Sequence, residues 1–142
     1  MSTFSHVPSS DTYNRLLTTV SALIETYGRA WTSQDPNLIL SVFTPDATYH
    51  ERVLRAPMRG HSEIKDYWES KVCREQGNIQ FRLNSLYVDP VRATAIAEWE
   101  AWFDDIPSGC RKHMSEVAIL AIEDDKISSL KEWWSSEKVS AS

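Results

Sequence analysis

Apolar residues recur at helical spacing in the first half of the chain. Positions three or four apart over 10–33 predict one long amphipathic helix. Asp35 and Pro36 predict the start of a second, short helix, because an acidic cap followed by proline suits the first helical turn. This helix is expected to bury Val42 and Phe43 before it ends. A third apolar stripe predicts a helix over 63–75.

Alternating apolar and polar residues predict strands elsewhere. The expected strands cover 47–52, 79–88, 93–103, 112–122 and 126–136, the last two joined by a tight turn at Asp124-Asp125. Runs of strands rather than alternating strands and helices exclude a parallel fold. The pattern therefore predicts an α+β fold, with three helices of the N-terminal half on one face of a mostly antiparallel, strongly curved sheet.

The length and net charge of the chain indicate how many domains it forms and which partners it is expected to bind. With 142 residues the chain is expected to form a single domain over 10–137, between flexible tails at 1–9 and 138–142. The net charge of -5 and the absence of a Lys/Arg-rich stripe argue against nucleic acid or an anionic membrane as partner. No signal peptide or membrane-length apolar run is recognisable, so a cytoplasmic protein is expected.

Several chemistries lack a motif. Cys73 and Cys110 form neither a CxxC pair nor a disulfide framework, and the four histidines form no HExxH or HxH pattern. No phosphate loop or GxSxG elbow occurs. We therefore expect neither a metal nor a cofactor. Six tryptophans are unusual for this length; they either line a pocket for an apolar ligand or fill a core and a dimer face.

The last predicted strand carries the most suggestive acid. Leu130, Glu132 and Trp134 share one of its faces. If that face is concave and dry, Glu132 is a carboxylate in an aromatic pocket, where burial raises the pKa of an acid toward neutral. If the face is solvated, Glu132 is an ordinary surface residue.

Hairpin arithmetic gives an expected register for that strand. A two-residue turn places Val117 opposite Glu132 and brings His113 to the same face as Glu132. The register of the strand 93–103 stays open, because a slip of one residue exchanges its faces. Trp99 inward is preferred, since the alternative buries Glu98 and Glu100 beside the other acids.

Three local signatures suggest a family. They are Phe43 to Glu51 (FTPDATYHE), Gly60 to Ile64 (GHSEI) and Asp125 to Trp134, which contains DKI followed by LKEWW. In this order the chain resembles the nuclear transport factor 2-like superfamily, in its SnoaL-like and limonene epoxide hydrolase-like branch, over about residues 16–136.

The resemblance implies a cone-shaped, cystatin-like roll whose curved sheet and helices enclose an apolar cavity, commonly in a homodimer. Members include isomerases, polyketide cyclases, dehydratases (lyases), epoxide hydrolases and non-catalytic binding modules, so the fold alone does not settle function. Compared position by position with the epoxide hydrolase, Tyr49 matches its tyrosine and Glu132 its water-polarising aspartate. Glu51 stands for its asparagine and Leu130 for its tryptophan. Its arginine has no counterpart near residues 98–101, which puts epoxide hydrolysis by that arrangement in doubt.

The candidate site combines both lines of argument. Its expected catalytic residues are Glu132, Glu51, Tyr49 and His113. Its expected substrate-binding residues are mostly aromatic or aliphatic, namely Tyr27, Trp31, Trp68, Trp99, Val117, Leu130 and Trp134. Two acids in one dry cavity titrate as a pair, one protonated and one ionised. Tyr49 could donate to an oxyanion, although a buried tyrosine often only satisfies a core partner, and His113 could equally be a plain strand residue.

Two functions remain in competition. One is a cofactor-independent acid–base enzyme, an isomerase, cyclase, dehydratase or hydrolase, acting on a small, largely apolar substrate such as a polyketide or terpenoid intermediate. The other is a non-catalytic binding or dimerisation module whose cavity is filled by its own aromatics. A homodimer is expected in either case. In the expected register its outer sheet face carries Met114, Leu120 and Trp133 beside Glu116 and Lys131.

Overall fold

The computed structural model describes residues 9–139. Its helices are α1 (Ser10–Thr32), α2 (Pro36–Leu40), α3 (Gly60–Tyr67) and a π-helical turn, η2 (Trp68–Cys73). Its strands are β1 (Phe43–His50), β2 (Met58–Arg59), β3 (Gln76–Asp89), β4 (Thr94–Asp105), β5 (Cys110–Glu123) and β6 (Lys126–Lys138).

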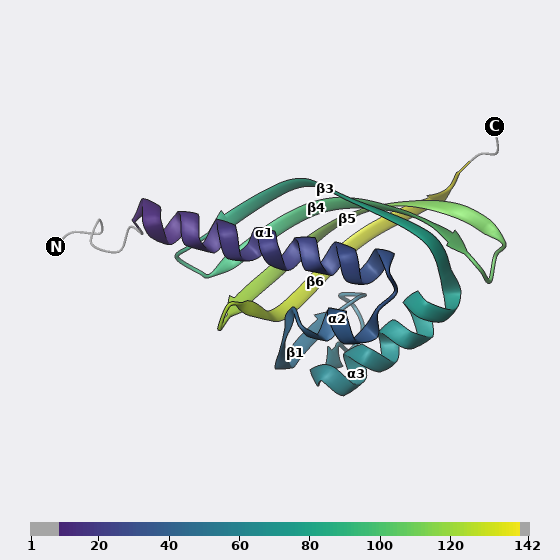
Figure 1. Cartoon of the computed structure of the whole chain (residues 1–142), viewed down its shortest axis with the longest axis horizontal. Coiled ribbons are helices and arrows are strands. Elements are labelled where there is room, and N and C mark those ends of the chain that lie inside the picture. The colour runs from purple at the N-terminus through teal and green to yellow at the C-terminus, as the bar shows by residue number, and fades with distance from the viewer. Residues whose placement is uncertain (1–8, 140–142) are drawn as a thin grey trace.

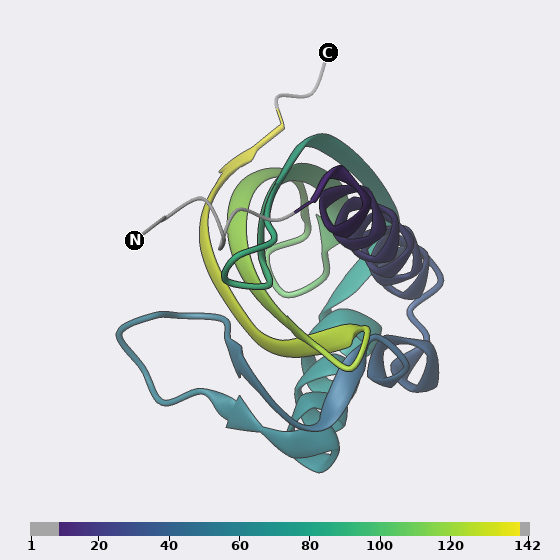
Figure 2. The ribbon, with the colours of Figure 1, turned by 90° about the vertical axis from the view of Figure 1, so that its left-hand side faces the viewer.

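All six strands form one strongly curved sheet in the order β2-β1-β6-β5-β4-β3 (Figure 1). Neighbouring strands are antiparallel except β1 and β6, which run parallel. Seen end-on, the sheet curls around the side on which the helices lie (Figure 2). The predicted α+β fold with helices on one face of a mostly antiparallel sheet is therefore confirmed.

The long first helix forms as its pattern predicts. Ser9 caps it, since its hydroxyl accepts a hydrogen bond from the amide of Thr12 at 3.2 Å. Its apolar stripe is buried against the sheet, and α1 packs on β3. At Gly28 the helix comes so close to Phe81 of β3 that any side chain at this position would collide with the ring. This close approach fixes one wall of the interior.

The second helix is shorter than expected. Asp35 caps it through hydrogen bonds from the amides of Asn37 and Leu38 to its Oδ1, but the helix ends at Leu40. Val42 and Phe43 are buried outside it, and β1 begins at Phe43 rather than at residue 47. The reason is tertiary: β6 offers backbone partners to this segment, and its Ile127 amide donates to the Val42 carbonyl at 2.8 Å.

The third predicted helix changes its geometry midway. After Tyr67 the α-helix widens into the π-helical turn, which no local residue pattern announces. The Gln34 side chain stabilises the end of this turn, because its amide nitrogen donates to the carbonyls of Val72 at 2.9 Å and Gln76 at 2.6 Å. Gly77, expected as the helix stop, already belongs to β3.

The hairpin of β5 and β6 decides which residues face inward. Asp124 and Asp125 both have positive φ (53° and 59°), as a type I′ turn requires, and Glu123 pairs with Lys126 as predicted. The register then shifts at a bulge, because Ala121 pairs with Ser129 and Ser128 is left as the extra residue.

The predicted register beyond the turn is therefore wrong by one residue. Ala118 rather than Val117 lies opposite Glu132, and Leu120 lies opposite Leu130. Every β5 side chain past the bulge has consequently exchanged faces relative to expectation. Glu116 faces the interior.

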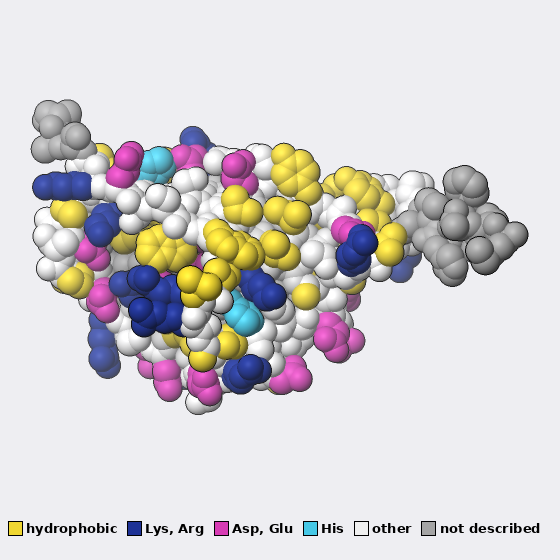
Figure 3. Space-filling view, turned by 180° about the vertical axis from the view of Figure 1, so that it is seen from behind, with side chains coloured by type: hydrophobic (Ala, Val, Ile, Leu, Met, Phe, Trp, Pro, Cys, Tyr) yellow, Lys and Arg dark blue, Asp and Glu magenta, His cyan; other side chains and the backbone are white. Residues whose placement is uncertain are grey.

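The outer face of the sheet also differs from expectation. Met114, Leu120 and Glu116 were expected there but point inward, whereas Trp133 and Lys131 lie outside as predicted. The exposed apolar residues on β4, β5 and β6 form what we call the outer patch (Figure 3), which consists of Ile96, Val117, Ile119 and Trp133. Ile96 pairs directly with Ile119, and Val117 with Trp133, so the outer patch is continuous across three strands.

The expected tails lie mostly outside the described residues, at 1–8 and 140–142. Lys138, assigned to the C-terminal tail from the sequence, still belongs to β6 and pairs with Lys112. Among the described residues, no helix is both long and apolar enough to cross a membrane.

Candidate active site

A cavity of about 100 Å³ lies between the concave face of the sheet, α1 and the α3–η2 segment. Its walls combine charged side chains with aromatic rings, the latter from Tyr27, Trp31, Tyr49, Tyr67, Trp68, Phe103 and Trp134. Trp31 also donates its indole N–H to Gln76 Oε1 at 2.8 Å, which fixes its ring at the wall.

Two carboxyl groups meet in this aromatic cavity. Glu132 of β6 and Glu116 of β5 are 5% and 3% exposed, both line the cavity, and each shifts the pKa of the other. The β-bulge at Ser128 brings them together, because it turns Glu116 to the face that Glu132 already occupies. Two buried carboxyl groups in contact cannot both be ionised without a large cost, so the pair holds a proton near neutral pH.

Burial sets the titration of this pair. It raises the pKa of Glu116 to about 7, and it raises the pKa of Glu132 well above its ordinary value. The neighbouring charge of Glu116 raises the pKa of Glu132 further.

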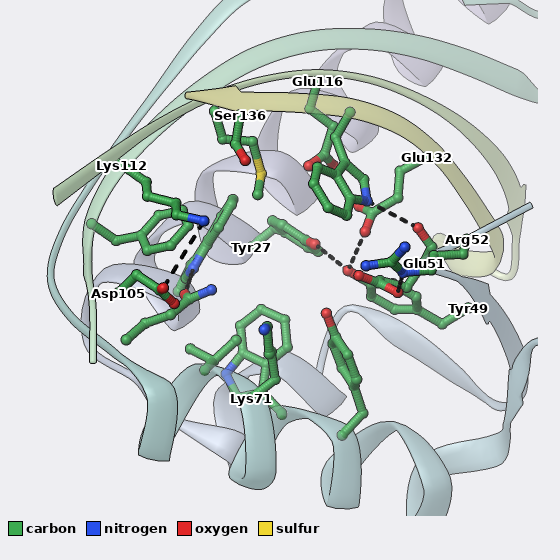
Figure 4. Close-up of a pocket in the computed structure, with 18 residues that line it drawn as sticks. Tyr27, Tyr49, Glu51, Arg52, Lys71, Asp105, Lys112, Glu116, Glu132 and Ser136 are labelled. Atoms are coloured by element: carbon green, nitrogen blue, oxygen red, sulfur yellow. Dashed lines mark hydrogen bonds and ion pairs between the residues drawn. The ribbon is translucent and has the colours of Figure 1, made fainter. Parts of the chain in front are cut away.

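The hydroxyl groups of two buried tyrosines form a hydrogen-bonded chain that ends on Glu132 (Figure 4). The Tyr49 hydroxyl donates to Glu132 Oε1 at 3.1 Å, and the Tyr27 and Tyr49 hydroxyl oxygens are 3.1 Å apart. Because the single hydroxyl proton of Tyr49 is donated in the hydrogen bond to Glu132, Tyr27 is the donor in the hydrogen bond to Tyr49. Burial, followed by the nearby charge of Glu132, raises the pKa of both tyrosines well above the ordinary value, so both remain protonated donors.

Few other donors reach Glu116. Within residues 9–139, no backbone amide, hydroxyl or amine donates to its Oε2. The indole N–H of Trp99, directly opposite Glu116 in the β4–β5 register, lies near its carboxyl group but makes no well-aligned hydrogen bond. The Oε2 atom of Glu116 is thus a buried acceptor without a hydrogen-bond donor among the described residues.

Glu51 and Arg52 lie beside the pair, just after β1. The Arg52 Nε is 3.4 Å from Glu51 Oε2, and its guanidinium lies 5.3 Å from the ring centroid of Trp134. The Trp134 indole N–H donates to the Glu51 backbone carbonyl at 3.2 Å. These contacts fasten the segment after β1 to β6 at the edge of the cavity, with the Glu51 side chain only one-fifth exposed.

Most of the sequence-predicted residues meet at this cavity. Those that line it are Tyr27, Trp31, Tyr49, Glu51, Trp68, Glu132 and Trp134. Trp99 faces inward but is buried behind the wall, with its ring 5.1 Å from that of Tyr27. Leu130 is likewise fully buried in the core next to β1.

Two predicted residues lie on the opposite face of the sheet, and the bulge is the reason. Val117 belongs to the exposed outer patch. His113 stacks on Trp102, with ring centroids 4.9 Å apart, and its Nε2 lies 2.8 Å from Glu100 Oε1. Neither residue can reach the cavity. Glu98 and Glu100 of β4 also face outward, so neither of these acids reaches the cavity.

Sequence reasoning missed Glu116 altogether. Both faces of β5 carry apolar residues, so alternation alone did not show which face is inside. The one available signal was the pair Ser128-Ser129 shortly after the turn, where the Ser128 hydroxyl now donates to the Ala121 carbonyl at 3.3 Å. Within the described residues, His, Cys, Asp and Glu form no cluster of three or more that could hold a metal ion.

Solved structures of similar shape include an epoxide hydrolase/cyclase-like enzyme, SalBIII, described in pyran ring formation in the polyether salinomycin. It is 19% identical, with a TM-score of 0.70 over 81% of this chain and 89% of that one. A limonene epoxide hydrolase-like epoxide hydrolase from M. tuberculosis is 14% identical, with a TM-score of 0.68 over 83% and 84% of the two chains. A putative isomerase from Bacillus subtilis is 14% identical, with a TM-score of 0.75 over 84% and 88%.

At these identities the structural matches establish the fold. No curated protein matches the sequence significantly. The model of the SnoaL-like domain family matches residues 24–130, which is most of the described chain. The chain therefore belongs to the SnoaL-like domain family.

Proposed function

We propose that this protein is a cofactor-independent acid–base enzyme that moves a proton on a small, largely apolar substrate, as an isomerase or cyclase does. One observation carries the proposal: Glu116 and Glu132 are two buried, neighbouring carboxyl groups that line the same cavity as several aromatic rings. Burying two acids costs free energy of folding, so such a pair is seldom kept for stability alone. Strongly perturbed pKa values cluster at functional sites.

The pair supplies a base and an acid together. The Glu116 carboxylate takes a proton from a C–H bond next to a carbonyl, and the electron pair of that bond moves onto the carbonyl oxygen. Glu132 then gives its proton to another atom of the substrate, and the pair returns to its starting state when the proton on Glu116 passes to Glu132. No proton or electron is left over.

The assignment refines the roles expected from the sequence. Glu116 replaces Glu51 as the partner of Glu132, because the Glu51 carboxylate is paired with Arg52 instead. Tyr49 acts through Glu132, to which it donates, rather than directly on the substrate. With a base and an acid in contact, the same site could also activate water against an epoxide, so hydrolysis remains within the proposed class.

The rate should depend on pH in a bell shape. Because the pKa of Glu116 is about 7, kcat/KM should rise with pH as this group ionises, with a midpoint near 7. It should fall again at higher pH, when Glu132 loses its proton. Turnover of an enolisable apolar ketone or an epoxide between pH 5 and 9.5 measures both limbs; a flat profile across pH 6–8 argues against Glu116 as the base.

A second candidate is a non-catalytic binding module of the same fold. The size of the cavity favours it, because about 100 Å³ leaves a bound molecule little room to rearrange. The two candidates differ in what they predict for the acid pair. A binding module needs no proton transfer, so its ligand would be recovered chemically unchanged after incubation.

We further propose that two copies associate through the outer patch. Its four apolar side chains form a continuous surface, with Glu98 of β4 and Lys131 of β6 exposed beside it. A two-fold axis would set the acid of one copy against the lysine of the other, so the face is self-complementary.

Trp133→Glu should weaken self-association at least about tenfold, because it puts a charge into the centre of the apolar contact. Sedimentation at micromolar concentration measures the effect. Ile106→Glu, in the exposed turn between β4 and β5, is the matched control and should leave association unchanged. A wild-type protein that sediments only as a monomer of about 16 kDa rules out the dimer.

A further inference from the structure

The end of the cavity away from the carboxyl pair has a different chemistry. Lys71 of η2, Lys112 of β5 and Asp105 of β4 line it, and we call these three residues the lysine end. In Figure 4, Lys112 and Asp105 lie on the side opposite Glu132, and Lys71 rises from η2 toward the cavity. One cavity therefore has an acidic end and an end with two cations.

Lys71 lies on the cavity side of η2. Trp68, Lys71 and Val72 all line the cavity, because positions three and four apart share one face of a helix. A π-helical turn is wider than an α-helical turn and is often found at functional sites. The Gln34 amide holds the turn open by taking the Val72 carbonyl that the wider geometry frees.

Both lysines can turn to a ligand at little cost. Lys71 pairs with Glu75 at 3.5 Å, but the two side chains are 41% and 40% exposed, and pairs of this kind contribute at most about 1 kcal/mol. Lys112 Nζ is 4.0 Å from Asp105 Oδ2, at the outer limit of an ion pair. Asp105 already accepts a hydrogen bond from the Ser108 hydroxyl, so its carboxylate does not depend on Lys112.

Charge decides which way a ligand would lie. The Glu116–Glu132 pair carries about one negative charge near neutral pH and repels an anion. The third cation that lines the cavity, Arg52, is engaged by Glu51 and by the Trp134 ring. Lys71 and Lys112 are therefore the cations placed to stabilise an anionic group at the end of the cavity away from the acid pair.

We propose that the substrate carries a carboxylate, which Lys71 and Lys112 hold while the apolar body of the molecule extends to Glu116 and Glu132. The lysine end is then a binding subsite that orients the substrate and supplies affinity remote from the reacting atoms. The second half of this statement rests on the proposed function, whereas carboxylate binding at the lysine end stands by itself.

Matched ligands test the subsite without turnover. Titration calorimetry would compare phenylacetate and 3-phenylpropionate with their primary amides, which have nearly the same shape and no charge. The carboxylates should bind about five- to tenfold more tightly, the effect of one charge-assisted hydrogen bond in a partly exposed site. Lys71→Met and Lys112→Met should each remove most of that preference and leave amide binding unchanged.

Lys65→Met is the matched control. Lys65 forms the same kind of pair, with Glu69 at 3.9 Å and exposures of 42% and 45%, but it does not line the cavity. Equal affinity for acid and amide, no measurable binding of either, or an equal effect of all three substitutions overturns the inference.

The two proposals fail in different ways. Glu116→Gln should retain the carboxylate preference, because the substitution is at the other end of the cavity. A carboxylate preference with undiminished turnover in Glu116→Gln defeats the proposed function alone. Loss of turnover in that variant without any carboxylate preference in the wild type defeats the lysine subsite alone.

Discussion

Glu116→Gln should lower kcat about 10²- to 10⁴-fold on any substrate that the protein turns over, with a much smaller change in KM. Glutamine keeps the size of the side chain, but it cannot take up a proton. Since Glu116 is the ionised member of the pair, its loss removes the base. Steady-state kinetics at pH 8, where the wild-type base is ionised, gives the largest contrast.

The carboxyl pair acts as a unit, which adds a second criterion. Glu132→Gln should lower kcat by a similar factor, and the double variant should be little worse than either single one, because groups that act together are not additive. Glu98→Gln, on the exposed outer face of β4, should behave as wild type. If Glu51→Gln proves far more damaging than Glu116→Gln, the base is Glu51 and the pairing proposed here is incorrect.

Glu116→Gln should also stabilise the protein at pH 8, by about 1–3 kcal/mol in the free energy of unfolding. In the folded protein the pKa of Glu116 is raised from 4.5 to about 7. Between these values the folded state binds more protons than the unfolded state, so the free energy of unfolding falls as the pH rises, by up to about 1.4 kcal/mol per pH unit. Glutamine has no proton to lose and escapes this penalty.

Urea unfolding at two pH values checks the sign. Near pH 4.5 the wild-type pair is protonated in the fold, so the variant should have no advantage; at pH 8 it should be clearly more stable. A stabilisation of equal size at both pH values would mean that packing, not ionisation, is responsible. An active-site acid that costs stability in this way is the expected compromise between function and folding.

Local sequence signals predicted the elements well wherever they acted alone. Asp35 caps its helix as its residue type indicates, and Asp124-Asp125 forms the expected tight turn, whereas Ser9, assigned to the flexible tail, caps α1. The resemblance to the SnoaL-like family located the cavity and placed Glu132, Tyr49 and Tyr27 around it. Periodicity and turn chemistry are local properties, so they can be read from the chain directly.

The failures share one cause, which is tertiary. The bulge at Ser128 and the π-helical turn at Trp68 each add an extra residue to a regular element. The pattern of apolar and polar side chains does not predict either of them. The bulge alone moved His113 and Val117 out of the site and Glu116 into it. Because strand side chains alternate, an error of one position is enough to exchange a catalytic residue for a surface residue.

The parallel pairing of β1 with β6 has a further consequence for how the molecule assembles. Tyr49 and Glu132, which meet through this pairing, are 83 positions apart in the chain, and so are Glu51 and Trp134. Contacts of such sequence separation form late and slow the folding rate, because a long loop must close before they contribute. The α1 helix and the β5–β6 hairpin can form early from local contacts, whereas the acid pair acquires its tyrosine support only when the two ends of the fold join. We therefore expect the contacts between β1 and β6 that support the acid pair to be among the last in this protein to form.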